Sequence, residues 1–271
     1  MTGASSMTTY DSGRTAAVKH SQAPYRSRPG GIAMVSLRVS MEGDVMQPAT
    51  LSDARRRGGS PSQTATRVLV MLDALGDPVG ADAPVANAVA RVASLIRVQK
   101  LDFWMRNPDY LADELLTDFD AGLLTLPQIQ DHVIRMLDGD APSLHSYPME
   151  RYLYGAYEFI DDALAVLKSY GQIDHHRAAD SGNLARRDYY LLDAGRATVR
   201  RMRAQVPQLE WYYQQTAAIA LLADASTGTT ARNRQYEQPE YENTRHGEII
   251  PSILERVRDR AVQLSVMKGT P

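Results

Sequence analysis

The residues best suited to chemistry are the arginines between residues 172 and 203. This stretch holds seven arginines and four aspartates, which gives it a formal charge of +3. The arginines are Arg177, Arg186, Arg187, Arg196, Arg200, Arg201 and Arg203, and the aspartates are Asp174, Asp180, Asp188 and Asp193. A guanidinium group presents N–H donors in a fixed fork that suits phosphate oxygens, so the stretch indicates contact with an anionic partner. The residues expected to make this contact are Arg177, Arg186, Arg187, Arg200 and Arg201.

The preceding stretch, residues 126–170, has the opposite charge. It holds three basic residues against seven acidic ones, a formal charge of −4. If the apolar side chains of the expected helix face the core, Glu158 and Asp162 lie on its open face, where they repel phosphate and suit a basic protein partner. Tyrosines are frequent between residues 147 and 213, and tyrosine is favoured at interfaces. The residues expected at a protein interface are Glu158, Asp162, Trp211, Tyr212 and Tyr213.

Other chemistry-bearing residues do not form a recognisable site. His175 and His176 are neighbours on an expected strand, so their side chains point to opposite faces and cannot chelate one ion. Asp161 and Asp162 lie about 100° apart on an expected helix and do not converge as a general acid and base must. The sequence has no cysteine and none of the Walker A, G-x-G-x-x-G, H-E-x-x-H or G-x-S-x-G motifs. It therefore predicts no enzyme activity, no cofactor and no metal site.

Apolar residues at helical spacing predict the elements that must position these side chains. Asn107-Pro108 ends one helix, since the residue before a proline disfavours the helical region. Thr125 is a plausible N-cap for a later helix, and Gly171 a plausible end for another. The helices expected before residue 172 are 64–75, 85–105, 108–116, 126–138 and 149–170.

A β-hairpin is expected after these helices. Two strands, 172–178 and 186–192, flank the turn residues 180–183, whose Gly and Asn tolerate positive φ. An isolated hairpin is marginal in water, so Ile173 and Tyr190 are expected to pack it onto the helices. A helix then follows Gly195, bends or breaks at Pro207 and continues as "QLEWYYQQTAAIALLADA" (208–225).

Two motifs in this region resemble bacterial winged-helix regulators of the MarR-like and PadR-like groups. "YYLLDAGR" (189–196) resembles their second wing strand and following helix start, Y-x-L-T-x-x-G-R, and "ALAVLKSYGQID" (163–174) is similar to the end of their recognition helix and the first wing strand. Leu192 stands where these proteins carry a capping Thr, so Asp193 is expected to cap the helix. The resemblance spans residues 126–205. It implies a mainly α-helical fold with a winged helix-turn-helix, one β-hairpin wing and additional N- and C-terminal helices.

Two functions remain open for such a fold. One is a homodimeric, DNA-binding transcription regulator that contacts double-stranded DNA through a basic wing. The other is an adaptor or accessory subunit that uses its winged helix for protein–protein interaction. "QKLDFWMRNPDYLADELL" (99–116) is similar to the middle subunits of bacterial three-component ABC-ATPase, SMC-like defence systems. The apolar side of 209–223 either pairs with a second copy of the chain or folds back onto the helices of residues 64–106.

Composition divides the chain into four regions. Residues 1–62 are expected to be an unstructured basic tail, either an upstream extension or an arm that touches nucleic acid. Residues 64–223 are expected to form the winged-helix domain, 224–247 a polar linker and 248–265 an amphipathic helix. The net charge of the chain is −2, which favours no partner class. The short apolar runs and the absence of cysteine predict a cytoplasmic protein that does not contact a membrane.

Overall fold

The structure is a computed structural model that describes residues 60–138, 149–152, 155–178, 186–222 and 225–264. All of these residues belong to one unit of the chain, residues 47–271. Most of the tail expected at 1–62, and all of the turn expected at 180–183, lie outside the described residues.

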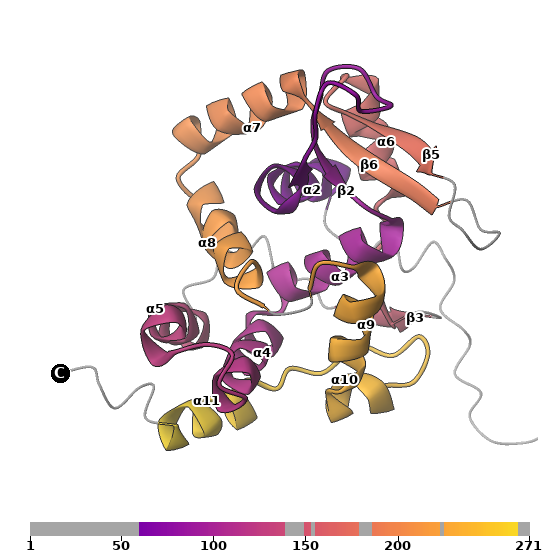
Figure 1. Cartoon of the computed structure of the whole chain (residues 1–271). Helices are drawn as coiled ribbons and strands as arrows, with labels where there is room; N and C mark the ends of the chain where they lie inside the picture. Colours follow the sequence, from indigo (N-terminus) through magenta and orange to yellow (C-terminus); the bar gives the residue numbers. More distant parts are fainter. Residues whose placement is uncertain (1–59, 139–148, 153–154, 179–185, 223–224, 265–271) are drawn as a thin grey trace, which may run out of the picture. The chain divides into compact units, whose positions relative to one another are not determined.

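The described residues are mainly helical and include a small antiparallel sheet, as the sequence predicts (Figure 1). The helices are α2 (Pro61–Leu75), α3 (Leu95–Arg106), α4 (Pro108–Asp120), α5 (Leu126–Leu137), α6 (Asp161–Ser169), α7 (Asp193–Gln205), α8 (Leu209–Ile219), α9 (Gly228–Tyr236), α10 (Pro239–Asn243) and α11 (Leu254–Gln263). The strands are β1 (Asp77–Pro78), β2 (Ala88–Val92), β3 (Glu150–Tyr152), β4 (Gly155–Tyr157), β5 (Ile173–Ala178) and β6 (Arg186–Leu192).

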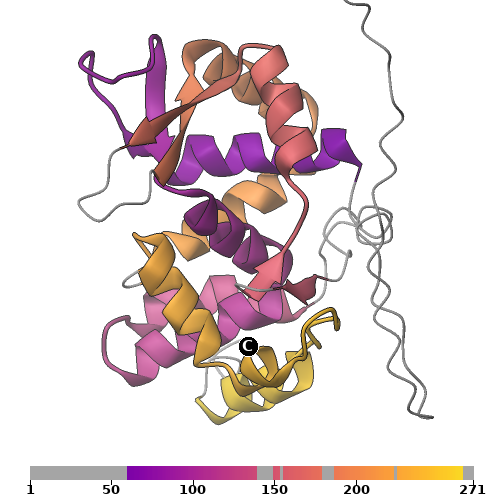
Figure 2. The same ribbon diagram turned by 90° about the vertical axis from the view of Figure 1, so that its right-hand side faces the viewer.

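Helix α2 is the centre of the core. It begins with a capping box, in which the Ser60 side chain accepts from the Gln63 N–H and the Gln63 side chain accepts from the Ser60 N–H. Its residues Val68, Leu69 and Leu72 are almost fully buried. The helix packs against α6 and α7 on one side and against α3 and α8 on the other (Figure 2). The helix expected over 64–75 is therefore confirmed.

Four strands form the main sheet in the order β1-β2-β6-β5, with every pair antiparallel. The hairpin predicted from 172–178 and 186–192 is confirmed as β5 and β6, and Ile173 and Tyr190 are each 3% exposed. Strand β2 pairs with the other edge of β6. The hairpin is thus anchored to the fold by a third strand as well as by helices.

The long helix expected over 85–105 is wrong in its first half, which forms strand β2. Asn87 and Ser94 have positive φ angles of 59° and 69°, which no α-helix accommodates, and they bound the strand on either side. Ser94 then caps α3, because its hydroxyl accepts from the Arg97 N–H at 3.2 Å. Pairing with the central strand β6 outweighs the helical spacing of the apolar residues here.

The helix expected over 149–170 is also wrong in its first half, where β3 and β4 form a small hairpin and α6 begins only at Asp161. Gly155 has φ +98°, and a Cβ there would lie 2.1 Å from the Tyr241 hydroxyl oxygen. Asp193 does not cap α7 but is its first residue, and Leu192 occupies the N-cap position without a side-chain bond.

The stretch expected to be irregular, 224–247, contains α9 and α10, and α9 packs on α3. The C-terminal helix is shorter than predicted and covers Leu254–Gln263. Ahead of it, backbone bonds join Ile250 to Met149 and Arg151 to Glu248 beside β3. Ile249, within the range expected to be helical, therefore lies outside the helix and is 47% exposed.

A network of charged side chains is buried between α2, α3 and the residues before α6. Arg67 of α2 bonds Asp102 of α3 and, at 2.8 Å, Glu158. Arg106 of α3 also bonds Glu158. All four side chains are at most 8% exposed. Burial, together with nearby Arg67, lowers the pKa of Arg106 to about 10, so its charge persists at neutral pH.

Glu158 is held on every side within this network. The Thr64 hydroxyl donates to its carboxylate at 3.0 Å, and the Gln99 side chain bonds both its backbone N–H and its carbonyl. The expectation that Glu158 lies on an open helix face is therefore wrong. The residue precedes α6, and its carboxylate neutralises two buried guanidinium groups that sequence spacing does not associate with it.

A second charged cluster attaches the C-terminal helices to α4. Arg234 of α9 bonds Glu114 and Asp118, each at 2.8 Å, and Arg260 of α11 bonds Asp113 at 2.7 Å. Burial raises the pKa of Glu114 to about 7 although Arg234 opposes this shift. The helices after residue 225 are thereby joined to the rest of the fold by ion pairs as well as by apolar packing.

The buried network supports a prediction about stability. Asp102→Asn keeps the shape of the side chain but leaves Arg67 and Arg106 with one carboxylate fewer in the core. We expect the free energy of unfolding to fall by about 3–5 kcal/mol. Urea unfolding followed by circular dichroism measures the change.

The control is Arg203→Gln, which breaks an ion pair with Glu210 in which both side chains are about half exposed. This variant should lose at most about 1 kcal/mol. An Asp102→Asn protein that unfolds at the wild-type urea concentration would contradict a stabilising role for the network.

Candidate functional site

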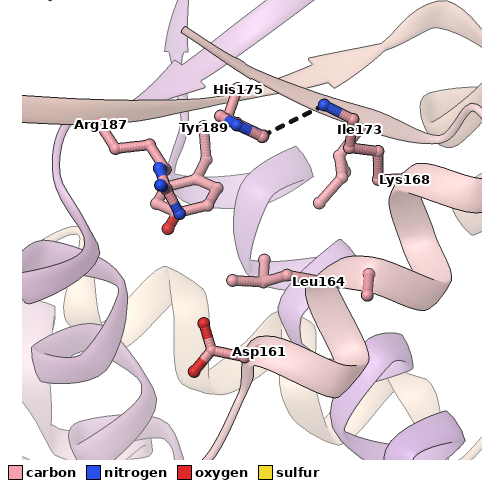
Figure 3. Close-up of a pocket in the computed structure, with 8 residues that line it drawn as sticks. Asp161, Leu164, Lys168, Ile173, His175, Arg187 and Tyr189 are labelled. Carbon is pink, nitrogen blue, oxygen red and sulfur yellow. Dashed lines mark hydrogen bonds between the residues drawn. The ribbon is translucent and has the colours of Figure 1, made fainter. Parts of the chain in front are cut away.

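A cleft of about 210 Å³ lies between α6 and the β5–β6 hairpin (Figure 3). Helix α6 and the two strands each contribute part of its lining. The lining residues are Asp161, Leu164, Ala165, Lys168, Ile173, His175, Arg187 and Tyr189. A second hollow adjoins it and is lined by Leu95, Arg177, Arg187 and Tyr189. Because Arg187 and Tyr189 line both, the two hollows share one wall.

The pairing of the hairpin strands brings the basic residues together. Arg177 lies directly opposite Arg187, and His175 lies directly opposite Tyr189. Side chains two positions apart on a strand share a face, so these four residues occupy one face of the hairpin. Both arginines are exposed. Like charges that face each other across a strand pair destabilise it, and a bound anion relieves that repulsion.

Lys168 is the third cation at the cleft, and it already has a carboxylate partner. Its Nζ lies 2.7 Å from Asp174 and 3.4 Å from Nδ1 of His175. The hydrogen bond from Lys168 lowers the pKa of Asp174, although partial burial opposes the shift. Burial lowers the pKa of His175, and the nearby cations Lys168 and Arg187 lower it further. The neutral form of the His175 ring therefore predominates at pH 7.

Tyr189 forms the apolar wall between the two hollows. Its pKa is raised mainly by burial, and hydrogen bonding to Arg187 opposes this shift. Figure 3 shows the Arg187 side chain beside the tyrosine ring. The hydroxyl thus stays protonated at neutral pH and is available as a hydrogen-bond donor.

Arg186, predicted to act together with Arg187, lies on the other face of β6. It makes two hydrogen bonds to Asp188, at 2.7 and 3.2 Å. Asp188 is 1% exposed and also accepts from the Ser94 N–H at 3.3 Å. Arg186 therefore helps to hold β6 against the start of α3, and its charge is balanced by Asp188.

The remaining arginines of the predicted anion surface lie on α7. Arg200 and Arg201 are exposed, and Arg201 donates to the Thr198 hydroxyl. Neither residue lines the cleft or the second hollow. The structure thus brings Arg177 and Arg187 together and leaves Arg200 and Arg201 on a separate helix.

The residues predicted for a protein interface are mostly buried. Trp211 is 9% and Tyr212 is 2% exposed, and their helix, α8, packs on α2 and α3. The Tyr213 hydroxyl donates to Asp73 at 3.1 Å. Of the two possibilities for this apolar side, folding back onto the chain's own helices is the one observed. Asp162 alone is exposed as predicted, in the first turn of α6.

Lys168, His175 and Tyr189 were not predicted as site residues. Strand parity could have found His175 and Tyr189, because His175 and Arg177 are two positions apart on β5, as are Arg187 and Tyr189 on β6. Counting alternate positions along both strands places these side chains on one face. No comparable pattern in the sequence places the α6 residues, such as Lys168, beside the hairpin.

No part of the described chain shows three His, Asp or Glu side chains placed to hold a metal ion. Within the same residues, no helix is both long enough and apolar enough to cross a membrane. Comparison of the chain with protein-family models, curated proteins and solved structures finds no match. The resemblance to winged-helix regulators therefore stays a prediction from sequence.

The charges around the cleft predict the titration of His175. Arg187→Gln removes a nearby cation, which favours the protonated ring, so the pKa of His175 should rise. It should stay below the ordinary value because burial, the larger cause, is unchanged. Histidine ring signals followed by NMR over a pH series measure this pKa.

Arg200→Gln serves as the control, since it removes an equal charge from α7, which contributes no residue to the cleft. The pKa of His175 should be the same in this variant as in the wild type. A fall, or no change, in the Arg187→Gln variant would show that the guanidinium does not act on the ring.

Proposed function

We propose that this protein is a non-enzymatic winged-helix protein that binds double-stranded DNA through the phosphate backbone. The observation that carries the proposal is the pair Arg177 and Arg187, which face each other on an exposed hairpin. Neither makes an ion pair with another described residue. Two unneutralised guanidinium groups at adjacent positions suit the closely spaced phosphates of a duplex.

The order of the elements supports a winged-helix interpretation. Helix α2 packs against both α3 and α6, and α6 is followed by the β5–β6 hairpin and then by α7. In this interpretation α6 is the recognition helix and the hairpin is the wing. Helices α4 and α5 and the hairpin β3–β4 lie between α3 and α6 as an insertion.

The charge of α6 favours contact through the wing. Asp161 and Asp162 in its first turn are exposed, and two carboxylates entering a groove meet phosphates of the same sign. Contacts to phosphate position a protein on DNA but do not read the bases. We therefore infer binding with little sequence preference, made by Arg177 and Arg187 rather than by the exposed face of α6.

The second candidate function is that of an adaptor subunit in a larger complex. The observation that favours it is the same exposed pair, Asp161 and Asp162, which suits a basic protein surface. A homodimer formed through α8 has no support from packing, because the buried Trp211 and Tyr212 already contribute to the core of their own chain. Both functions are consistent with a cytoplasmic protein that lacks a cofactor, which we retain as part of the proposal.

Charge reversal on the hairpin tests DNA binding. The double variant Arg177→Glu, Arg187→Glu should bind a fluorescent random-sequence duplex far more weakly than the wild type at low salt. Each lost phosphate contact lowers the slope of log affinity against log salt by about 0.9, so the slope should fall by about 2. Fluorescence anisotropy at several salt concentrations gives both quantities.

Arg232→Glu combined with Arg245→Glu is the matched control. It changes the net charge equally, at two exposed arginines that line neither hollow, and should keep the wild-type slope. The variant Arg200→Glu, Arg201→Glu tests whether α7 adds contacts of its own. If the wild-type chain fails to bind duplex at low salt, the DNA proposal is wrong and the adaptor function is favoured.

A further inference from the structure

The cleft between α6 and the hairpin carries two charges of opposite sign that are not paired with each other. Asp161 belongs to the first turn of α6, and Arg187 belongs to β6. Figure 3 shows their side chains approaching the cleft from opposite sides. Neither makes an ion pair with any other described residue. A ligand that satisfies both groups must carry an anionic group at one end and a cationic group at the other.

The other ionisable residues at the cleft add no free charge. Lys168 is paired with Asp174 at 2.7 Å. His175 is mainly neutral at pH 7, and Tyr189 is protonated, for the reasons given above. The cleft therefore presents one free carboxylate and one free guanidinium, which is the pattern that complements a zwitterion rather than a simple anion.

The rest of the lining suits the middle of such a ligand. Leu164 and Ile173 are at most 8% exposed and form an apolar floor with Ala165. Tyr189 offers an aromatic wall and a hydroxyl donor. The volume of about 210 Å³ is smaller than the roughly 300–1,000 Å³ of pockets that hold drug-sized ligands. A ligand of this cleft is thus a small molecule with an apolar centre.

We propose that the cleft binds a small zwitterion of the apolar amino-acid class, with the ammonium group at Asp161 and the carboxylate at Arg187. The side chain of the ligand lies over Leu164 and Ile173, against the ring of Tyr189. Arg187 makes a two-pronged contact with the carboxylate, a geometry that a guanidinium group favours.

This site also has a consequence for nucleic-acid binding, which rests on the function proposed above. Arg187 cannot bind the ligand carboxylate and a DNA phosphate at the same time. The bound zwitterion therefore competes with duplex, and each weakens the binding of the other by the same factor.

Calorimetric titration of the full chain, without DNA, tests the site. The probes are L-leucine and L-phenylalanine, each compared with the analogue that lacks the ammonium group (isocaproate, hydrocinnamate) and the analogue that lacks the carboxylate (isoamylamine, phenethylamine). At least one zwitterion should bind saturably, and its single-charge analogues should bind at least about tenfold more weakly, because each loses a charge-assisted hydrogen bond.

Variants at the two charged positions test the contacts to the ammonium group and to the carboxylate one at a time. Asp161→Asn should bind the zwitterion no better than it binds the carboxylate analogue, and Arg187→Gln no better than the amine analogue. The control is Asp162→Asn, which removes an exposed carboxylate of the same helix turn that does not line the cleft, and it should bind as the wild type does.

Three results would overturn the proposal: no saturable binding of either zwitterion, analogues that bind as tightly as their parent, or an Asp161→Asn variant with wild-type affinity. None of these depends on DNA. Asp161→Asn also retains Arg177 and Arg187 and loses only a carboxylate that repels phosphate, so it binds duplex at least as well as the wild type if the function proposed above is correct. Failure of the ligand site and failure of DNA binding are therefore distinguishable.

Discussion

Two arginines and two carboxylates, closed off from solvent between α2, α3 and the chain leading into α6, constrain the rest of this structure. A buried charge without a partner is strongly unfavourable, so each of the four side chains fixes where the others can lie. Glu158 matters most for the site, because it stands three positions before the first residue of α6. We infer that the network sets the position of α6 against α2, and through it one wall of the cleft.

Alternate side chains of the central strand β6 have two different roles, because they point to opposite faces of the sheet. Arg187 and Tyr189 face the cleft, whereas Arg186 and Asp188 face the start of α3 and hold the sheet together. Arg186 and Arg187, although adjacent in sequence, therefore have different roles, because Arg186 is paired with a carboxylate and Arg187 is not. Counting the arginines of the hairpin therefore overestimates the positive charge available to a partner. Only the guanidinium groups that no carboxylate neutralises contribute to it.

Much of the helical framework and the β5–β6 hairpin could be predicted from the sequence, because α2, α4, α5 and α7 have local signals in caps, prolines and apolar spacing. Strand β2 could not, since most of its pairing is with β6, far along the chain, and its nearer partner β1 has only two residues. The position of Glu158 cannot be predicted for the same reason, because its partners Arg67 and Arg106 lie on helices far away in the sequence. The cleft was partly foreseeable from strand parity, whereas its α6 side depends on tertiary packing.

The pairing of β2 with β6 constrains how this protein folds while it is being synthesised. As the chain leaves the ribosome, β2 emerges early with only the two-residue strand β1 beside it, and its other edge stays unpaired until β6 has been synthesised. Because β2 and β6 are far apart in the sequence, their pairing is slow. Until it forms, the unpaired edge of β2 can pair with strands of other chains. A ribosome stalled before residue 186 would therefore carry a nascent chain in which one edge of β2 is unpaired, and chaperones that bind extended segments would recognise that edge.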